Sequence, residues 1–491
     1  MLTKKISTWL KQNLFVLLLG ASIAIWWGIC VMCHPSVPIF INEADPVYLP
    51  VVGAVSTILL FIPLIIYLCG TEFRQQHWQM KLQSIGIALM LSTIVFRPYA
   101  YLHAQLFFFG FTVISFFADR QRHFQKPPVF YIACCIYFIW IAISMLWTQD
   151  RHEAGVYFNR IVPLASYALM FSLICLTWNN YRQLILLFWR VVCVASVLTI
   201  ACGIYETQRL GADFWDFIQI KKTQIDYIPV YDILYAWSGT GHPSYNVLWL
   251  IAGLTSGFFL FEKRLITRLE IISSCLLILL VVVVTQSRIG VVLWLLTALS
   301  GLIYVLRHHK YVLWSTLSLA GICGLYIGIT QIETISTVLS DPARVKLANI
   351  AMDYLRADPW KGCGLGGMTY DYLESVIGYE FKSWWPQYDA PTMYPHNQYL
   401  GDWMQSGILG LIVLLGVIVC GFYDAIRQRS FIGIAYMTAV VVFMFIEMPF
   451  HFLTGTTVIA FFLCFIFVNR QNPDCDKETS RPSCDLTTNM R

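Results

Sequence analysis

Apolar runs of about 20 residues recur along the whole chain, and a run of this length is what a helix needs to cross a bilayer. The chain has 491 residues, of which 58% are hydrophobic and 12% are charged, whereas soluble domains carry about 25% charged residues. The sequence therefore predicts an all-α polytopic membrane protein and excludes a soluble globular core. A net charge of +5 is too small to indicate binding to nucleic acid.

We count fourteen apolar segments, and two short ones, at 82–97 and 100–117, could form a re-entrant pair, which would leave twelve spans. The first segment follows Lys4 and Lys5, and it is too long for a signal peptide, so we expect it to be retained. The segments lie at 13–32, 48–69, 82–97, 100–117, 129–147, 161–177, 184–205, 244–261, 270–286, 289–306, 311–330, 404–422, 431–447 and 452–468.

Positive charges collect in alternate connections, and by the positive-inside rule these face the cytoplasm. The sequence thus predicts a multi-pass membrane protein with both termini cytoplasmic; in a bacterium this would be the inner membrane, and the opposite face would be the periplasm. The opposite, periplasmic face carries two long connections, 206–243 and 331–403. The positive residues are Arg74, Lys81, Arg120, Arg122, Lys126, Arg182, Lys263, Arg264, Arg268, Arg307, Lys310, Arg427 and Arg429.

This pattern predicts four regions. The long loop should contain an amphipathic helix at about 341–357, started by Asp341-Pro342, and the polar tail should be disordered and cytoplasmic. The regions are a transmembrane bundle of about eleven spans at 1–330 that includes the loop 206–243, the periplasmic loop at 331–403, three transmembrane helices at 404–468 and the tail at 469–491.

The stretch 394–410 closes the only long polar segment of the chain. His396 and Asn397 stand just before an apolar helix, and Gly407 and Gly410 lie inside it. The positive end of the helix dipole disfavours imidazolium, so the ring should stay neutral at pH 7 and accept a proton as a general base. The other interpretation is an interfacial histidine that only hydrogen-bonds a loop. Glycines at i and i+3 would bare one helix face to a neighbouring backbone.

Four arginines fall on the predicted periplasmic face: Arg97, Arg160, Arg288 and Arg344. Arg288 lies between two apolar runs, where a lipid-exposed arginine costs about 3 kcal/mol, so it should have a partner or reach lipid headgroups. A guanidinium group binds phosphate oxygens bidentately. These residues are therefore candidates for binding a phosphorylated substrate.

Three aromatic residues of the long loop, Trp384, Trp385 and Tyr388, could stack on sugar rings or belong to an interfacial aromatic belt, and we leave both open. Glu447 and His451, four residues apart at another outer turn, are interpreted as a structural pair or as helpers of the site. Cys30 and Cys33 form a C-x-x-C pair with no second pair near it, and no other metal site stands out, so we predict neither a metal nor a cofactor. The fifteen cysteines lie mostly inside apolar runs, where they behave as small hydrophobes.

The pattern of His396-Asn397, nine residues, Gly407, two residues and Gly410 resembles the signature of the O-antigen ligase superfamily. That superfamily also contains O-antigen polymerases and bacterial protein O-oligosaccharyltransferases. Two further features resemble it: the Ser-Arg turn at Arg288, and Arg344 followed by a Pro-x-x-Gly-x-Gly turn at 359–364. The resemblance covers roughly residues 285–410.

The resemblance implies a GT-C-like glycosyltransferase architecture, with the long periplasmic loop between the third-last and fourth-last spans. It implies transfer of a glycan from undecaprenyl diphosphate to a sugar hydroxyl of lipid A–core at the periplasmic face, within membrane lipid. The reaction would be metal-independent and inverting. His396 would be the general base, Arg288 and Arg344 would bind the diphosphate, and the remaining candidates would bind substrate: Asn397, Arg160, Arg97, Trp384, Trp385 and Tyr388.

Three alternatives remain open at this point. An O-antigen polymerase would join two lipid-linked repeats, and a protein O-oligosaccharyltransferase would use a serine or threonine acceptor. A lipid-linked glycan transporter or flippase would need ionisable residues within the spans, broken helices at the midplane and internal repeats. The charges instead gather at span ends, with Arg190 as the main exception.

Overall fold

The computed structural model describes residues 59–95, 98–118, 126–148, 150–209, 243–285, 287–315, 342–357, 359–366 and 395–471, together with three isolated positions. Within these ranges the chain is mostly helical. Five helices are long and apolar enough to cross a membrane, which agrees with the predicted all-α membrane protein. They are Val129–Trp147, Trp178–Ala201, Ser244–Glu262, Arg288–Leu306 and Gln398–Arg427.

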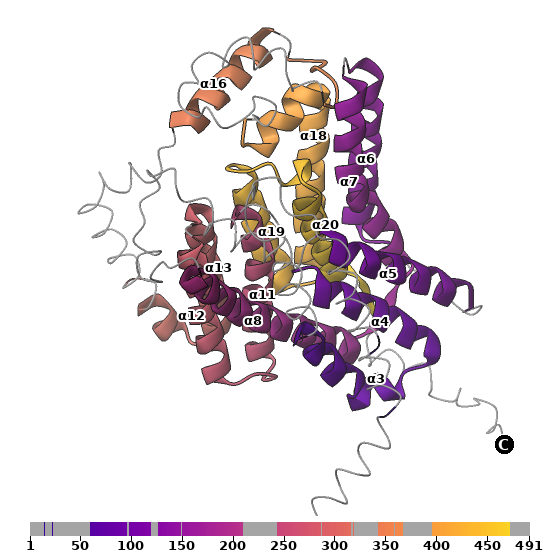
Figure 1. The fold of residues 1–491 in the computed structure, drawn as a ribbon, viewed down its shortest axis with the longest axis vertical. Helices are drawn as coiled ribbons and strands as arrows, with labels where there is room; N and C mark the ends of the chain where they lie inside the picture. The colour runs from indigo at the N-terminus through magenta and orange to yellow at the C-terminus, as the bar shows by residue number, and fades with distance from the viewer. Residues whose placement is uncertain are drawn as a thin grey trace, which may run out of the picture.

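Within the described residues, the helices overlap the predicted apolar segments but several have other bounds (Figure 1), and most of the predicted spans at 13–32 and 311–330 and the first part of 48–69 lie outside these residues. The N-terminal helices are α3 (Thr71–Gln75), α4 (Trp78–Thr93), α5 (Pro98–Ala118), α6 (Val129–Ser144), η1 (Met145–Trp147), α7 (Arg151–Ser172) and α8 (Trp178–Arg209). The central ones are α11 (Pro243–Glu262), α12 (Arg268–Val284), α13 (Arg288–Leu306) and α16 (Pro342–Ala357). The last are α18 (Gln398–Arg427), α19 (Phe431–Met444), η4 (Pro449–His451) and α20 (Leu453–Phe467).

Polar residues at the segment boundaries fix where three of these helices begin. Ser287, Asn397 and Ser430 precede α13, α18 and α19, and each side-chain oxygen accepts a hydrogen bond from a backbone N–H of the first turn. Such caps satisfy donors that a helix start leaves unpaired. Asn397 therefore starts α18 at Gln398, which is earlier than the apolar run at 404–422 predicts.

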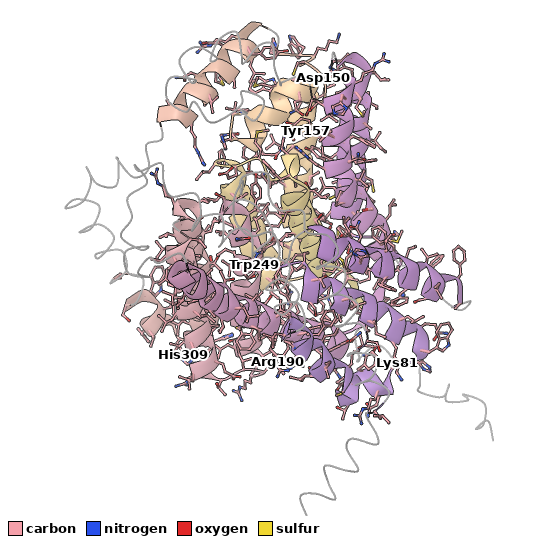
Figure 2. All side chains as sticks on the ribbon, viewed as in Figure 1. Lys81, Asp150, Tyr157, Arg190, Trp249 and His309 are labelled. Atoms are coloured by element: carbon pink, nitrogen blue, oxygen red, sulfur yellow. The ribbon has the colours of Figure 1, made fainter. Side chains whose placement is uncertain are left out.

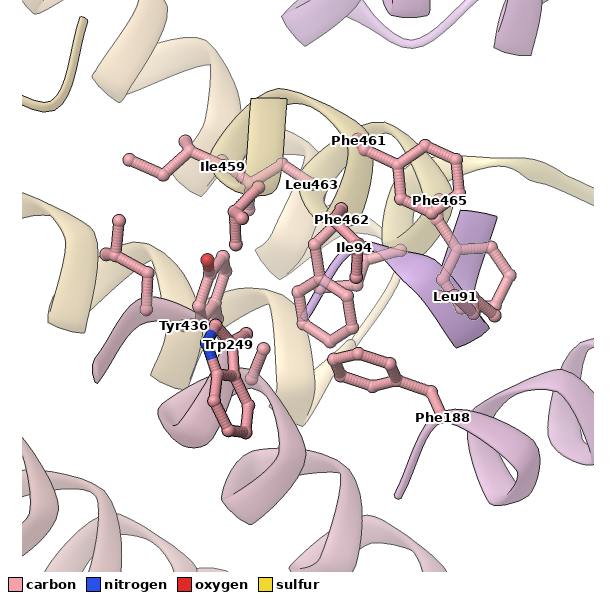
Figure 3. Packing of buried hydrophobic residues seen from close by; sticks show 14 of the residues in the cluster. Leu91, Ile94, Phe188, Trp249, Tyr436, Ile459, Phe461, Phe462, Leu463 and Phe465 are labelled. Atoms are coloured by element: carbon pink, nitrogen blue, oxygen red, sulfur yellow. The ribbon is translucent and has the colours of Figure 1, made fainter. Parts of the chain in front are cut away.

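Helix α20 forms the centre of the core. Every residue from Thr454 to Phe467 is buried, and the helix packs against α7, α11 and α19. Figure 3 shows Phe462 of α20 close to Phe188 of α8, and their ring centres are 5.0 Å apart. A helix that is apolar on all sides can be surrounded by protein or by lipid, and in α20 the neighbouring helices cover every side.

The two ends of the bundle differ in the residues they carry. Figure 2 shows Asp150 and Tyr157 near one end, and Lys81 and His309 near the other. Lys81 and His309 belong to connections that the charge pattern assigns to the cytoplasm. The orientation in the membrane stays a prediction, but the end with Tyr157 is the one predicted to be periplasmic.

A two-stranded parallel sheet, absent from the all-α prediction, joins two distant parts of the chain. Strand β1 (Cys175–Thr177) pairs with β2 (Asn469–Gln471), with Cys175 opposite Asn469. The predicted span at 161–177 instead ends as a helix at Ser172. The backbone N–H and C=O groups that follow α7 and α20 hydrogen-bond to each other in this sheet, as buried backbone groups require. The predicted tail thus begins with a strand, and its remainder, 472–491, lies outside the described residues.

Candidate active site

His396 lies at the entrance to α18 in an unusual backbone conformation. Its φ angle is +47°, a left-handed value that few non-glycine residues adopt and that costs about 1–3 kcal/mol. The next residue, Asn397, holds this corner. Its Oδ1 accepts from the backbone N–H of Leu400 over 3.1 Å, and its Nδ2 donates to the carbonyl of Phe445 over 3.2 Å. The substrate contact predicted for Asn397 stays a prediction, beside this observed role in joining α18 to the end of α19.

Glu447 joins two of the predicted catalytic residues. Its Oε2 lies 3.3 Å from Nδ1 of His396, and its Oε1 accepts from Nη2 of Arg344 over 2.8 Å. Nη1 of Arg344 also donates to the carbonyl of Ile446 over 2.7 Å. The Glu447 side chain is only 1% exposed. A buried carboxylate is tolerated when charged or hydrogen-bonding partners surround it, so this cluster depends on all three side chains.

A second polar cluster, adjoining the first, surrounds His451. Its ring lies 4.8 Å from that of Tyr157, and Nε2 of Gln405 donates to its Nε2 over 3.3 Å. Burial, and then the positive charge of Arg160, lower the pKa of His451 to about 3. The ring is therefore a neutral hydrogen-bonding group at physiological pH.

Arg160 is held against the same segment. Its Nη1 donates to the carbonyl of His451 over 2.9 Å, and its guanidinium group lies 4.9 Å from the ring centre of Tyr157. Both residues come from α7. The chain between Phe445 and Phe452, here called the 445–452 segment, thus contacts Asn397, Arg344 and Arg160. These side chains come from three separate parts of the sequence.

Arg288 is the first residue of α13 and its side chain is exposed. Two contacts place its helix start at the same end of the bundle. A Cβ built on Gly290 would lie 2.8 Å from Val247 of α11, and the hydroxyl of Tyr245, also in α11, donates to the carbonyl of Met448 over 3.3 Å. Arg288 therefore belongs to the same end as the 445–452 segment.

Gly407 breaks α18 where the sequence predicts an intact helix with one bare face. Its φ and ψ angles are +71° and −175°, a region that is essentially reserved for glycine. A Cβ there would lie 2.0 Å from the carbonyl oxygen of Trp360, so a neighbouring backbone does approach closely. Gly410 has another role, because its missing Cβ leaves space for the Ser406 hydroxyl of the same helix.

The loop at 359–366 supplies the hydrogen bonds that the break removes from α18. The N–H groups of Cys363 and Gly364 each donate to a carbonyl of the helix, Met404 and Gln405 respectively, over 2.8 Å. The N–H of Ile408 donates back to Pro359 over 3.2 Å. The predicted Pro-x-x-Gly-x-Gly turn is therefore the segment that completes α18 beside the site.

Four predicted substrate-binding residues, Arg97, Trp384, Trp385 and Tyr388, lie outside the described residues. Among the residues that the structure describes, no group of three or more His, Cys, Asp or Glu side chains is arranged to hold a metal ion. Glu447 and His451 are polar residues between two apolar segments, which is the signal by which the sequence singles them out as a structural pair or as helpers of the site. The partners that they contact depend on the folded arrangement.

The comparisons with known proteins agree with the motif. The family model described as O-antigen ligase matches residues 273–415. This region contains Arg288, Arg344 and His396, whereas Arg160 and Glu447 lie outside it. A search of the curated proteins finds no match. The match of residues 273–415 to this family model supports the resemblance of the chain to the O-antigen ligase superfamily.

Proposed function

We propose that this chain is an O-antigen ligase-like glycosyltransferase of the bacterial inner membrane with GT-C-like architecture. It transfers a glycan from undecaprenyl diphosphate to a sugar hydroxyl of lipid A–core at the periplasmic face. The observation that carries the proposal is the shared contact of His396 and Arg344 with the buried carboxylate of Glu447. A base held by an orienting group, with a guanidinium group beside it, is an arrangement suited to group transfer.

His396 is the general base of the proposed reaction. With Nδ1 against Oε2 of Glu447, its Nε2 takes the proton from the acceptor hydroxyl. The acceptor oxygen then forms a bond to the anomeric carbon as the bond from that carbon to the diphosphate oxygen breaks. The carboxylate keeps the ring oriented and stabilises the imidazolium that forms, as a general base requires. Direct displacement of this kind inverts the anomeric centre.

The arginines bind the leaving diphosphate, which departs with the bonding electron pair. Its growing negative charge is stabilised by fixed positive charge, which Arg344, Arg288 and Arg160 provide. Nη1 and Nη2 of Arg344 each make one contact with the 445–452 segment, which holds the guanidinium charge beside His396. Diphosphate is a good leaving group, so the proposed transfer needs neither a general acid nor a metal.

The test is glycan transfer by the purified protein in proteoliposomes without an ion gradient. The parent protein should transfer glycan from the lipid-linked donor, and His396→Ala should abolish transfer while the protein still inserts and stays monodisperse. His309→Ala is the matched control, because this exposed histidine lies near the other end of the bundle (Figure 2). Near-parent transfer by His396→Ala would remove this residue from the proposed role.

The alternatives within the superfamily are separated by the lipopolysaccharide of a deletion strain. Loss of all long chains with accumulation of lipid-linked polymer indicates a ligase, and a core bearing a single repeat indicates a polymerase. Unchanged lipopolysaccharide with unglycosylated secreted proteins indicates a protein O-oligosaccharyltransferase. The break at Gly407 and the charged residue Arg190 within α8 are features that a transporter would also show, and transfer without a gradient excludes transport as the sole activity.

A further inference from the structure

A buried hydrogen-bonded chain connects the start of α18 to the 445–452 segment. Nε2 of Gln398 donates to Oδ1 of Asp402 over 2.8 Å, and Oε1 of Gln398 accepts from the backbone N–H of Phe450 over 3.0 Å. Oδ2 of Asp402 accepts from the hydroxyl of Tyr137 over 2.7 Å. Each of these four residues is at most 3% exposed. We call Tyr137, Gln398, Asp402 and the Phe450 amide the brace.

The brace lies between the two halves of the site. Gln398 is two residues after His396, and Phe450 is three residues after Glu447. Packing follows the same path: the rings of Tyr137 and Phe450 are 5.8 Å apart, and a Cβ on Gly401 would lie 1.9 Å from the Met448 side chain. A shift of the 445–452 segment relative to α18 would therefore change the contact between His396 and Glu447.

We propose that Gln398 and Asp402 are positioning residues for glycan transfer, an inference that rests on the proposed function. In this role the brace sets the distance between His396 and Glu447. Its hydrogen-bonding roles are complementary. The amide of Gln398 must donate to Asp402 and accept from Phe450, while Asp402 accepts from both Gln398 and Tyr137. A side chain with the wrong donor or acceptor leaves a buried polar group unsatisfied, which a folded protein relieves by moving its neighbours.

Swapping the amide of residue 398 and the carboxyl group of residue 402 tests this proposal. Gln398→Glu places a second carboxylate against Asp402, 2.8 Å away in the parent, and should push the 445–452 segment out of place. Adding Asp402→Asn restores every donor and acceptor. The introduced amide then donates to the introduced carboxyl group and accepts from Tyr137, and the brace keeps one carboxyl group and one amide. Asp424→Asn is the matched control, because Asp424 is a buried carboxylate near the other end of α18 that accepts from the N–H of Phe130 over 2.7 Å.

The full-length variants are compared in proteoliposomes with the lipid-linked donor and acceptor. Gln398→Glu should lower kcat by about 100-fold, the effect of a small misplacement of catalytic groups, with KM changed by less than about threefold since substrate contacts are kept. The double exchange should recover kcat to within about tenfold of the parent. Asp424→Asn should transfer at the parent rate. Failure of the double exchange to recover kcat, while it remains folded, would overturn the proposal.

Hydrogen exchange of the peptide covering 445–452 gives a readout that does not depend on transfer. The amide hydrogens of this peptide should exchange faster in Gln398→Glu than in the parent. In the variant that carries both Gln398→Glu and Asp402→Asn, they should exchange at the parent rate. Faster exchange with unchanged kcat would mean that the brace is only structural, and the positioning role would be overturned. His396→Ala is run alongside: parent-rate transfer by this variant refutes the proposed function, whereas loss of transfer there with full activity in Gln398→Glu refutes the brace alone.

Discussion

Replacing Gly407 by alanine should destabilise the protein by about 2–6 kcal/mol, and two independent effects make up this range. An alanine at φ +71° and ψ −175° costs about 1–3 kcal/mol in backbone strain. Its Cβ would also lie 2.0 Å from the carbonyl oxygen of Trp360. Relieving such an overlap costs typically about 1–3 kcal/mol, because backbone and not a flexible side chain must move.

Unfolding of the purified protein in detergent, followed by its melting temperature, measures this effect. Gly416→Ala is the control within the same helix: nothing lies within 4 Å of its built Cβ, so it should be neutral or stabilising by up to about 1 kcal/mol. Gly410→Ala should fall between the two, because its Cβ meets the Ser406 hydroxyl, which can rotate away. If Gly407→Ala and Gly416→Ala melt together, the break in α18 is not as described.

Three further predictions concern single side chains. Arg344→Lys should lower kcat/KM for transfer by about tenfold, because lysine cannot make both contacts with Ile446 and Glu447; an unchanged value would contradict this. His451 takes up a proton near its ordinary pKa of 6.5 in the unfolded chain, but only near pH 3 in the folded protein. Between these two values, the free energy of unfolding should therefore fall by about 1.4 kcal/mol for each unit by which the pH drops. Melting temperatures should therefore depend less on pH in His451→Gln than in the parent, and equal slopes would refute the burial argument. Arg288→Gln should raise KM for the donor without changing the melting temperature, since the side chain is exposed; a donor titration with unchanged KM would remove Arg288 from diphosphate binding.

Much of the site follows from local sequence rules. The polar pair His396-Asn397 before an apolar run predicts a helix start at this point, and α18 begins at Gln398. The apolar spacing in 341–357 predicts a helix, and α16 occupies 342–357 with Leu347, Ala351 and Leu355 buried. The spacing of apolar residues along a helix and the polar residues before its first turn are local features, so a single sequence is enough to find them.

The parts that sequence reasoning missed depend on tertiary contacts. Glu447 meets His396 across 51 residues of chain, and only the turn between α19 and α20 decides which side chains it reaches. Gly407 and Gly410 fit a bare helix face equally well in sequence, and the pairing of Cys363 and Gly364 with α18 decides that one of them breaks the helix. The three-residue strands β1 and β2 are too short to show a period, so their pairing has no sequence signal.

The central claim is that His396 and Glu447 act as one unit, and a double-mutant cycle in proteoliposomes measures this directly. Initial transfer rates are compared for the parent, Glu447→Gln, His396→Ala and the double variant, each with the same insertion and monodispersity. Glu447→Gln alone should lower kcat by at least about tenfold. In the His396→Ala background the same change should lower the residual rate by a clearly smaller factor, because Glu447 then has no base to orient and only its contact with Arg344 is weakened. Losses that multiply in the double variant would contradict the account.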